Sequence, residues 1–411
     1  MSKSKDSFYA ILISATLCII LLFSSAVIFD FNIFEHNGYD SYTRQALAWR
    51  EGRTYLDDDP GSIAYLELAI FDGKYYVSFP PVPSIVEFIL TLFFGANTPN
   101  QFMLYIYTIV SCIALTLVFY KKHNLYLSCV LGLTASVGTN ILSLVAFGGV
   151  WHEAQCLSFM LCSLAVLLIQ SDKKFYNGLA LFFAALAVGC RPFTVIFIPF
   201  LLFELYKKNI SGEKDKTLKE KIVELKIFIS YLIAPVLIAL GLMLYNYVRF
   251  GSFFEFGHNY LPEFTAAEKG QFDISYLIPN LKQAFKLPFE FTPEFRLNIN
   301  SFSANIFYVF NPIIAVFFYY NIKSIIKSLK AYDIIWFIAV MAFIFATCMH
   351  RTLGGHQFGA RYFIDFIPYM AFYISKKTIS KKWGIPVLTL ICLFAVSLNI
   401  YGAYFLMSQK F

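Results

Sequence analysis

Apolar runs long enough to cross a lipid bilayer recur along almost the whole chain. A membrane-spanning helix needs about 20 mostly apolar residues. With 58% hydrophobic and 14% charged residues, the chain is far more apolar than a soluble domain. We therefore predict an all-α fold, a polytopic transmembrane helix bundle of about 11 spans that forms a single domain over residues 1–411. The expected spans are 8–29, 102–120, 124–146, 154–170, 176–190, 192–206, 227–248, 303–320, 332–349, 362–375 and 384–406.

The lysines of the sequence fall on alternate connections between these runs. If the N-terminus is cytoplasmic, the lysine-rich connections all lie on the cytoplasmic side, and most acidic residues lie on the other side. This asymmetry is the usual signature of membrane orientation. It accounts for the net charge of +7 without a nucleic-acid partner. The lysine-rich connections are 121–122, 173–174, 207–226, 323–330 and 376–382.

The eight cysteines all lie inside apolar runs, and none has a histidine at metal-ligand spacing. Small buried side chains explain them better than a disulfide framework or a zinc site. The sequence also has no glycine-rich nucleotide-binding loop. We therefore expect no cofactor, and the sequence leaves a requirement for a divalent metal open.

The most informative polar segment is residues 30–83, between the first two expected spans. A connection of this length is uncommon unless it is functional. We expect a short surface helix over 36–52 with Asp40 in its first turn, and an interfacial helix over 84–96. Asp40 is a candidate catalytic residue. The alternative is a helix N-terminal residue favoured by the helix dipole, or an i,i+4 partner of Arg44.

Other polar groups are expected on the same external face. His152 and Glu153 follow a Gly-Gly pair, where they could bind a metal or a substrate hydroxyl, or simply begin a helix. Arg191 lies between two short apolar runs, where it must face polar protein or reach the interface. A second long external loop, residues 249–302, contributes Arg249 and His258. A last stretch, residues 350–369, contributes Arg351, His356 and Arg361; there, an Arg361–Asp365 helix pair is the alternative to substrate binding.

Several of these stretches resemble bacterial members of the GT-C superfamily of polytopic glycosyltransferases, which includes the protein O-mannosyltransferases and the lipid A aminoarabinose transferase. The similar segments occur in the family order and cover most of the chain. They are GYDSYTRQALAWREG, DGKYYVSFPPVP, LTLFFGAN, VGCRPF, YNYVRFGSFFEFGHNY and GGHQFGARYFIDFIPY.

The resemblance implies an inverting transfer of a sugar from a polyprenyl-phosphate donor to an extracytoplasmic glycan, lipid or protein acceptor. It implies an active site outside the cytoplasm, in a bacterial plasma (inner) membrane. Asp40 matches the family's first-loop catalytic base, and Arg361 matches an arginine near the lipid phosphate. Glu153 falls where many members carry a second acid, although its His-Glu form departs from the commoner patterns. The sequence shows no large soluble C-terminal domain, which argues against an oligosaccharyltransferase.

The competing hypotheses are a transporter or flippase for a lipid-linked sugar, and a non-catalytic relative that binds such lipids. Transporters often contain internal repeats and broken helices near mid-membrane. Here the sequence shows no repeat, and its polar residues gather on one face. We therefore favour the transferase.

Overall fold

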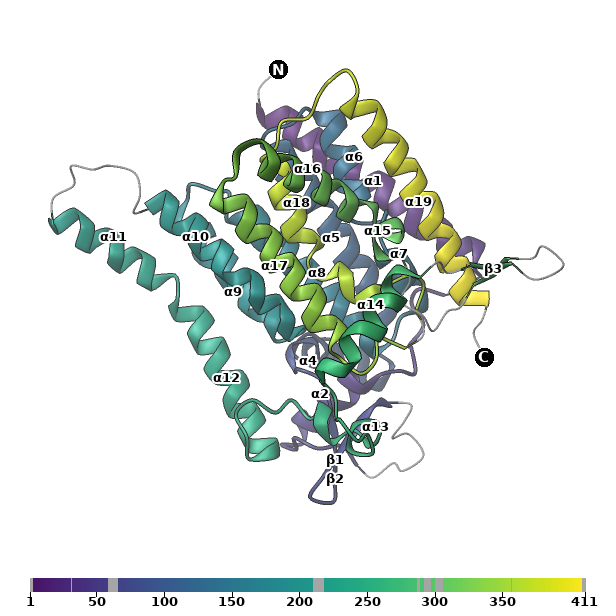
Figure 1. Ribbon diagram of the computed structural model, residues 1–411. Helices are drawn as coiled ribbons and strands as arrows, with labels where there is room; N and C mark the ends of the chain where they lie inside the picture. Colours follow the sequence, from purple (N-terminus) through teal and green to yellow (C-terminus); the bar gives the residue numbers. More distant parts are fainter. Residues whose placement is uncertain are drawn as a thin grey trace.

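A computed structural model of the protein describes residues 3–30, 32–57, 66–209, 218–286, 289–291, 297–299, 306–355 and 357–408. The described chain is mostly helical and forms one bundle (Figure 1), so the predicted fold class is confirmed. The longer helices are α1 (Lys3–Ile28), α5 (Asn100–Tyr120), α8 (Val150–Leu168), α9 (Lys174–Val188), α12 (Ile233–Phe250), α16 (Pro312–Ser328), α17 (Ala331–Cys348) and α19 (Gly384–Ser408).

Shorter elements connect and cover these helices. The shorter α-helices are α2 (Ser41–Arg50), α4 (Val82–Phe94), α6 (Leu125–Ala135), α7 (Ile141–Phe147), α10 (Ile198–Asn209), α11 (Leu218–Ser230), α13 (Pro262–Thr265), α14 (Leu277–Phe285), α15 (Phe307–Phe310) and α18 (Ile367–Ser375). The 3₁₀ helices are η2 (Gly95–Asn97), η3 (Pro192–Phe197), η4 (His258–Tyr260), η5 (Ile274–Tyr276) and η6 (Arg361–Ile364). Two antiparallel hairpins pair β1 (Leu68–Phe71) with β2 (Lys74–Val77) and β3 (Phe289–Phe291) with β4 (Leu297–Ile299).

The centre of the bundle is formed by α5, α8 and α18. Helix α5 packs against α1, α6 and α8, and α8 also packs against α9 and α18. All nine residues of α18 are buried, so this short helix is surrounded by protein rather than by lipid. Helix α12 is the opposite case, because most of its apolar side chains are exposed. Figure 1 shows α11 and α12 as an arm along one side of the bundle, the placement expected of a lipid-facing helix.

Six helices of the described chain are long and apolar enough to cross a membrane. Several expected spans instead consist of two shorter pieces. The expected span 124–146 is divided into α6 and α7 by a turn at Ser136–Asn140, and 192–206 begins as a 3₁₀ helix at Pro192. The count of about 11 spans therefore stays a prediction, whereas the integral membrane character follows from the six long helices.

The hairpin β1–β2 lies at the end of the bundle that also carries α2 and α13 (Figure 1). Its strands are joined by Asp72 and Gly73, with Phe71 opposite Lys74. Both turn residues have positive φ, 50° and 68°. An Asp-Gly pair in this conformation is the favoured two-residue connection of a hairpin. The hairpin therefore has a fixed register, which determines where the residues at its ends point.

The lysine-rich connections meet at the other end of the bundle. Lys208 Nζ donates to the carbonyl oxygens of Ile169 (2.6 Å) and Ser171 (2.8 Å). Lys122 donates to the carbonyl of Lys376, whose own ammonium pairs with Glu204. The lysine-rich end and the hairpin end thus lie on opposite sides of the molecule, as their segregation in the sequence predicts.

Candidate functional site

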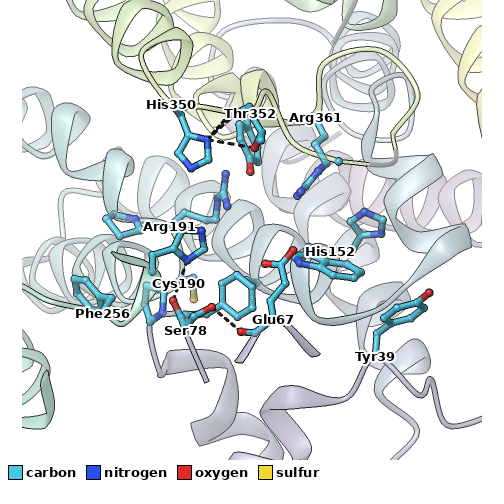
Figure 2. Close-up of a pocket in the computed structure, with 18 of the residues that line it drawn as sticks. Tyr39, Glu67, Ser78, His152, Cys190, Arg191, Phe256, His350, Thr352 and Arg361 are labelled. Carbon is cyan, nitrogen blue, oxygen red and sulfur yellow. Dashed lines mark hydrogen bonds between the residues drawn. The ribbon is translucent and has the colours of Figure 1, made fainter. Parts of the chain in front are cut away.

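A cavity of about 1090 Å³ lies at the hairpin end, where the segments that the sequence predicts to be external converge. It is lined by residues 32–39 of the first external loop, by the start of α8, by Cys190–Phe193 and by the stretch 350–365. Residues 254–272 of the second external loop contribute a further part of the lining. Figure 2 shows side chains from these separate segments pointing into one space.

One wall of the cavity carries two arginines. The guanidinium groups of Arg191 and Arg361 both contact the ring of Tyr362, at 4.8 and 4.7 Å from its centroid. Arg191 Nε also donates to Asp365 Oδ2 (2.9 Å). Asp365 Oδ1 accepts a second hydrogen bond from Gln155 Nε2 (2.8 Å). Asp365 is therefore the partner of Arg191, and the sequence alternative of an Arg361–Asp365 pair does not occur.

Among the described residues, Arg361 has no carboxylate partner. Its side chain is buried, with the residue only 5% exposed, and it pairs with no described acidic residue within 4.0 Å. One terminal nitrogen is 3.4 Å from Gln155 Oε1, and Nε has no hydrogen-bond partner in the described chain. A buried cation is costly unless an opposite charge or hydrogen-bond acceptors satisfy it. This arrangement favours binding of an anion in the cavity.

Asp40 occupies the N-cap position of α2 and is 8% exposed. Its Oδ1 accepts from Arg44 Nε (2.8 Å) and its Oδ2 lies 3.0 Å from His36 Nε2. The Arg44 pair that was one alternative from the sequence is therefore present. Asp40 itself does not line the cavity, although His36 and Tyr39 beside it do.

Glu153 and His152 point in different directions from the first turn of α8. His152 lines the cavity, with its ring 5.3 Å from that of Phe147. Glu153 is 2% exposed and instead faces Glu87 of α4, outside the cavity lining. The Gly-Gly pair before α8 has positive φ at both residues. At Gly148, an added Cβ would lie 1.8 Å from Gln101 Oε1, so this turn requires glycine.

Two further histidines lie in the cavity wall, His258 and His350, with ring centroids 6.2 Å apart. Burial lowers the pKa of each to about 4, so both are neutral at pH 7. His258 Nδ1 donates to the carbonyl of Ser78 (3.0 Å), which leaves Nε2 as a hydrogen-bond acceptor. No group of three or more metal-ligating side chains occurs in the described chain. These histidines are suited to bind hydroxyl groups.

Two other predicted substrate-binding residues, Arg249 and Arg351, do not line the cavity. Arg249 is buried behind the hairpin, where it donates to the carbonyl of Val77 (2.9 Å). Arg351 is exposed and donates to the carbonyl of Glu263. His356 lies outside the described residues. The structure thus brings His152, Arg191, His258 and Arg361 together, and it separates Arg249 and Arg351 from them.

The sequence reasoning did not select Glu67, which lines the cavity just before β1. Figure 2 shows its carboxylate extending toward the wall that carries Arg361. One signal could have identified it. Glu67 stands between Leu66 and Leu68, and in an extended segment such an acid faces away from the side that its neighbours bury.

No family model matches the chain, and no curated protein matches its sequence. Among solved structures, the chain is similar to the archaeal oligosaccharyltransferase AglB from Archaeoglobus fulgidus in complex with an inhibitory peptide and a dolichol-phosphate. The TM-score is 0.50 at 11% identity, covering 98% of this chain and 55% of AglB. This chain therefore spans about half the length of AglB.

The chain is also similar to ArnT from Cupriavidus metallidurans. With ArnT bound to undecaprenyl phosphate, the TM-score is 0.49 at 9% identity, covering 97% of this chain and 75% of ArnT. With apo ArnT it is 0.48 at 11% identity, covering 96% and 76%. At these identities the comparisons bear on fold, and the similarity to AglB supports the GT-C fold expected from the sequence.

Proposed function

We propose that the protein is a membrane glycosyltransferase that takes a sugar from a polyprenyl-phosphate donor and transfers it to an acceptor outside the cytoplasm. The observation that carries this proposal is Arg361, a buried guanidinium without a described acidic partner in the wall of a large cavity. Arginine suits phosphate because its planar group donates two parallel hydrogen bonds to two oxygens.

The donor class follows from where this cation lies. The cavity is at the end of a membrane bundle, and the AglB structure that shares the fold contains a dolichol-phosphate. A lipid phosphate would place its charge at Arg361 and its chain toward the bilayer. The neighbouring Arg191 is already neutralised by Asp365, so it adds less positive charge at the phosphate.

Sugar transfer also requires a group that removes the acceptor's proton and groups that hold the sugar. The neutral histidines His258 and His350 can bond its hydroxyls, and His152 borders the same space. For the proton, the first external loop offers Asp40, which the sequence predicts, and Glu67. With a single carboxylate as base, the acceptor attacks the anomeric carbon directly and the lipid phosphate leaves. One such displacement inverts the configuration at that carbon.

The proposal is tested by binding of undecaprenyl phosphate to the purified protein in lipid nanodiscs. Arg361→Ala should weaken the affinity about 10- to 100-fold, because a hydrogen bond to a charged group contributes about 1.5–3 kcal/mol. Arg361→Lys keeps the charge but loses the two-pronged donor, so it should bind between wild type and Arg361→Ala.

A matched control is Arg53→Ala. Arg53 lies in the first external loop, pairs with Glu51 and Asp57, and does not line the cavity. Its replacement should leave the affinity unchanged. Equal affinity of wild type and a correctly folded Arg361→Ala protein would remove the main support for a phosphate donor.

A further inference from the structure

We propose that Glu67 is the residue that accepts the acceptor's proton during sugar transfer, an assignment that rests on the proposed function. Five carboxylates line the cavity in the described chain: Glu35, Glu67, Glu255, Glu263 and Asp365. Their surroundings differ enough to separate them.

Four of the five are poorly placed to act as a base. Asp365 is held by Arg191 and Gln155. Glu255 accepts from the backbone N–H of Gly257 and from Asn259, both at 2.6 Å. Glu35 and Glu263 are exposed to solvent. Glu67 is half-buried and forms no ion pair with any described residue, so its carboxylate remains available within the cavity.

The backbone on both sides of Glu67 is fixed. Ser41 Oγ donates to the carbonyl of Leu66, and Ser78 Oγ donates to the carbonyl of Glu67, both at 2.8 Å. Leu66 and Leu68 are fully buried against the first-loop core. Glu67 itself has φ of 49°, a left-handed conformation that is uncommon for a residue with a side chain. These constraints direct the carboxylate into the cavity and away from the two leucines.

The electrostatic surroundings suit a base. Burial raises the pKa of Glu67 to about 7, and this effect outweighs the indole of Trp151 and the positive Arg361, which act in the opposite direction. A carboxylate with a pKa near the working pH is about half ionised there, and its ionised form binds a proton firmly enough to remove it from an attacking hydroxyl.

The reaction then balances within the site. The acceptor oxygen forms a bond to the anomeric carbon as its proton moves to a Glu67 carboxylate oxygen. The bond between that carbon and the phosphate oxygen breaks, and its electron pair stays on the phosphate, opposite Arg361. Glu67 afterwards releases the proton to solvent. In this scheme Asp40 is a positioning residue, because its two oxygens hold His36 and Arg44 at the start of α2.

The test uses the full-length protein in nanodiscs. The donor is the fraction of undecaprenyl-phosphate-linked sugars extracted from host cells that were fed ¹⁴C-glucose. The acceptor is supplied by membranes of host cells in which the gene for this protein has been deleted. Glu67→Gln should transfer label about 10²- to 10⁴-fold more slowly than wild type, the usual effect of losing a general base. Its affinity for undecaprenyl phosphate should stay unchanged. Glu268→Gln, an exposed external glutamate outside the cavity, should transfer at the wild-type rate.

The pH profile separates a base from a structural residue. The wild-type rate should fall as the pH drops below about 7, because Glu67 becomes protonated. Glu67→Asp keeps a carboxylate and should retain this acidic limb at a lower rate, whereas Glu67→Gln should lose it. If Glu67→Gln does not fold, the wild-type and Glu67→Asp profiles decide the matter, and the absence of an acidic limb from both overturns the assignment.

The outcomes also separate this assignment from the proposed function. A wild-type protein that neither binds undecaprenyl phosphate nor transfers label overturns both. A wild-type protein that binds but does not transfer is a non-catalytic binder, which also ends the assignment. Wild-type transfer with an equally active Glu67→Gln overturns Glu67 alone, and a large loss confined to Asp40→Asn would return the role to Asp40.

Discussion

At the residue scale, His36 lines the cavity and also contacts Asp40, the catalytic residue predicted from the sequence. Its Nδ1 lies 2.8 Å from the carbonyl of Thr98 and its Nε2 lies 3.0 Å from Asp40 Oδ2. Both contacts are hydrogen bonds only when both ring nitrogens carry protons. The bond to Asp40 is the main cause of a raised pKa of His36, and burial opposes it. The charged imidazolium is therefore the form that this site stabilises.

This pair predicts a pH-dependent stability. Because the folded pKa of His36 is raised, its contribution is fully present below the ordinary pKa of about 6.5, and it is lost as the pH rises through the raised value. Compared with His36→Gln, wild type should be more stable by up to about 1 kcal/mol at pH 5.5 and equally stable at pH 9. Thermal unfolding of both proteins across this range measures the difference. A constant difference at all pH values would show that His36 acts through packing instead.

Residue types and spacing in the sequence predicted part of the site. Arg191 was selected because a charged group at membrane level must face polar surroundings. His258 and Arg361 were selected because they lie in polar stretches expected on the same face, and all three residues line the cavity. The partners of these residues could not be predicted. Arg191 and Asp365 lie 174 residues apart, so their ion pair depends on how the helices pack. Glu67 was missed because its flanking leucines indicate only that its side chain faces away from theirs, and the cavity on that side is formed by segments distant in the sequence.

At the element scale, the β1–β2 hairpin shows why Arg249 is separated from the cavity. Arg249 closes α12, and its guanidinium lies 4.2 Å from the ring centroid of Tyr245 and 4.7 Å from that of Phe250. It also bonds the Val77 carbonyl at the end of β2. Arg249 therefore joins α12 to the hairpin through a hydrogen bond. From the sequence alone, this structural contact could not be distinguished from substrate binding.

Replacing Arg249 should separate these two roles. Arg249→Ala removes a charged hydrogen bond and cation–π contacts, so it should destabilise the protein by about 1–3 kcal/mol. Its affinity for undecaprenyl phosphate should match wild type, in contrast to Arg361→Ala. Thermal unfolding and nanodisc binding measure the two effects. An affinity loss as large as that of Arg361→Ala, in protein that folds normally, would place Arg249 in the substrate site after all.

Helix boundaries were predicted well where apolar runs end at charged connections, as for α5 and α17. They were predicted poorly where a buried polar contact interrupts an apolar run. The break between α6 and α7 is an example, since the Asn140 backbone N–H donates to Asn311 Oδ1 (2.9 Å) and its side chain donates to the Phe358 carbonyl. These partners are distant in sequence, so an apolar window cannot reveal the break.

At the scale of the whole molecule, the separation of charge was predictable because it depends only on composition along the chain. The lysine-rich connections gather at one end and the cavity lies at the other. By the positive-inside rule we expect the lysine end to be cytoplasmic, and the cavity would then open outside the cytoplasm. The proposed lipid donor and acceptor both require that orientation.

Cysteine labelling tests the orientation directly. All eight native cysteines are buried, so a single introduced cysteine should label above a low background. Lys121→Cys and Lys327→Cys lie at exposed positions of the lysine-rich end, and Glu268→Cys lies at an exposed position of the second external loop. In intact cells a membrane-impermeant maleimide should label Glu268→Cys and leave the other two unlabelled until the membrane is permeabilised. The reverse pattern would place the cavity in the cytoplasm, where an extracytoplasmic acceptor could not reach Glu67 or Arg361.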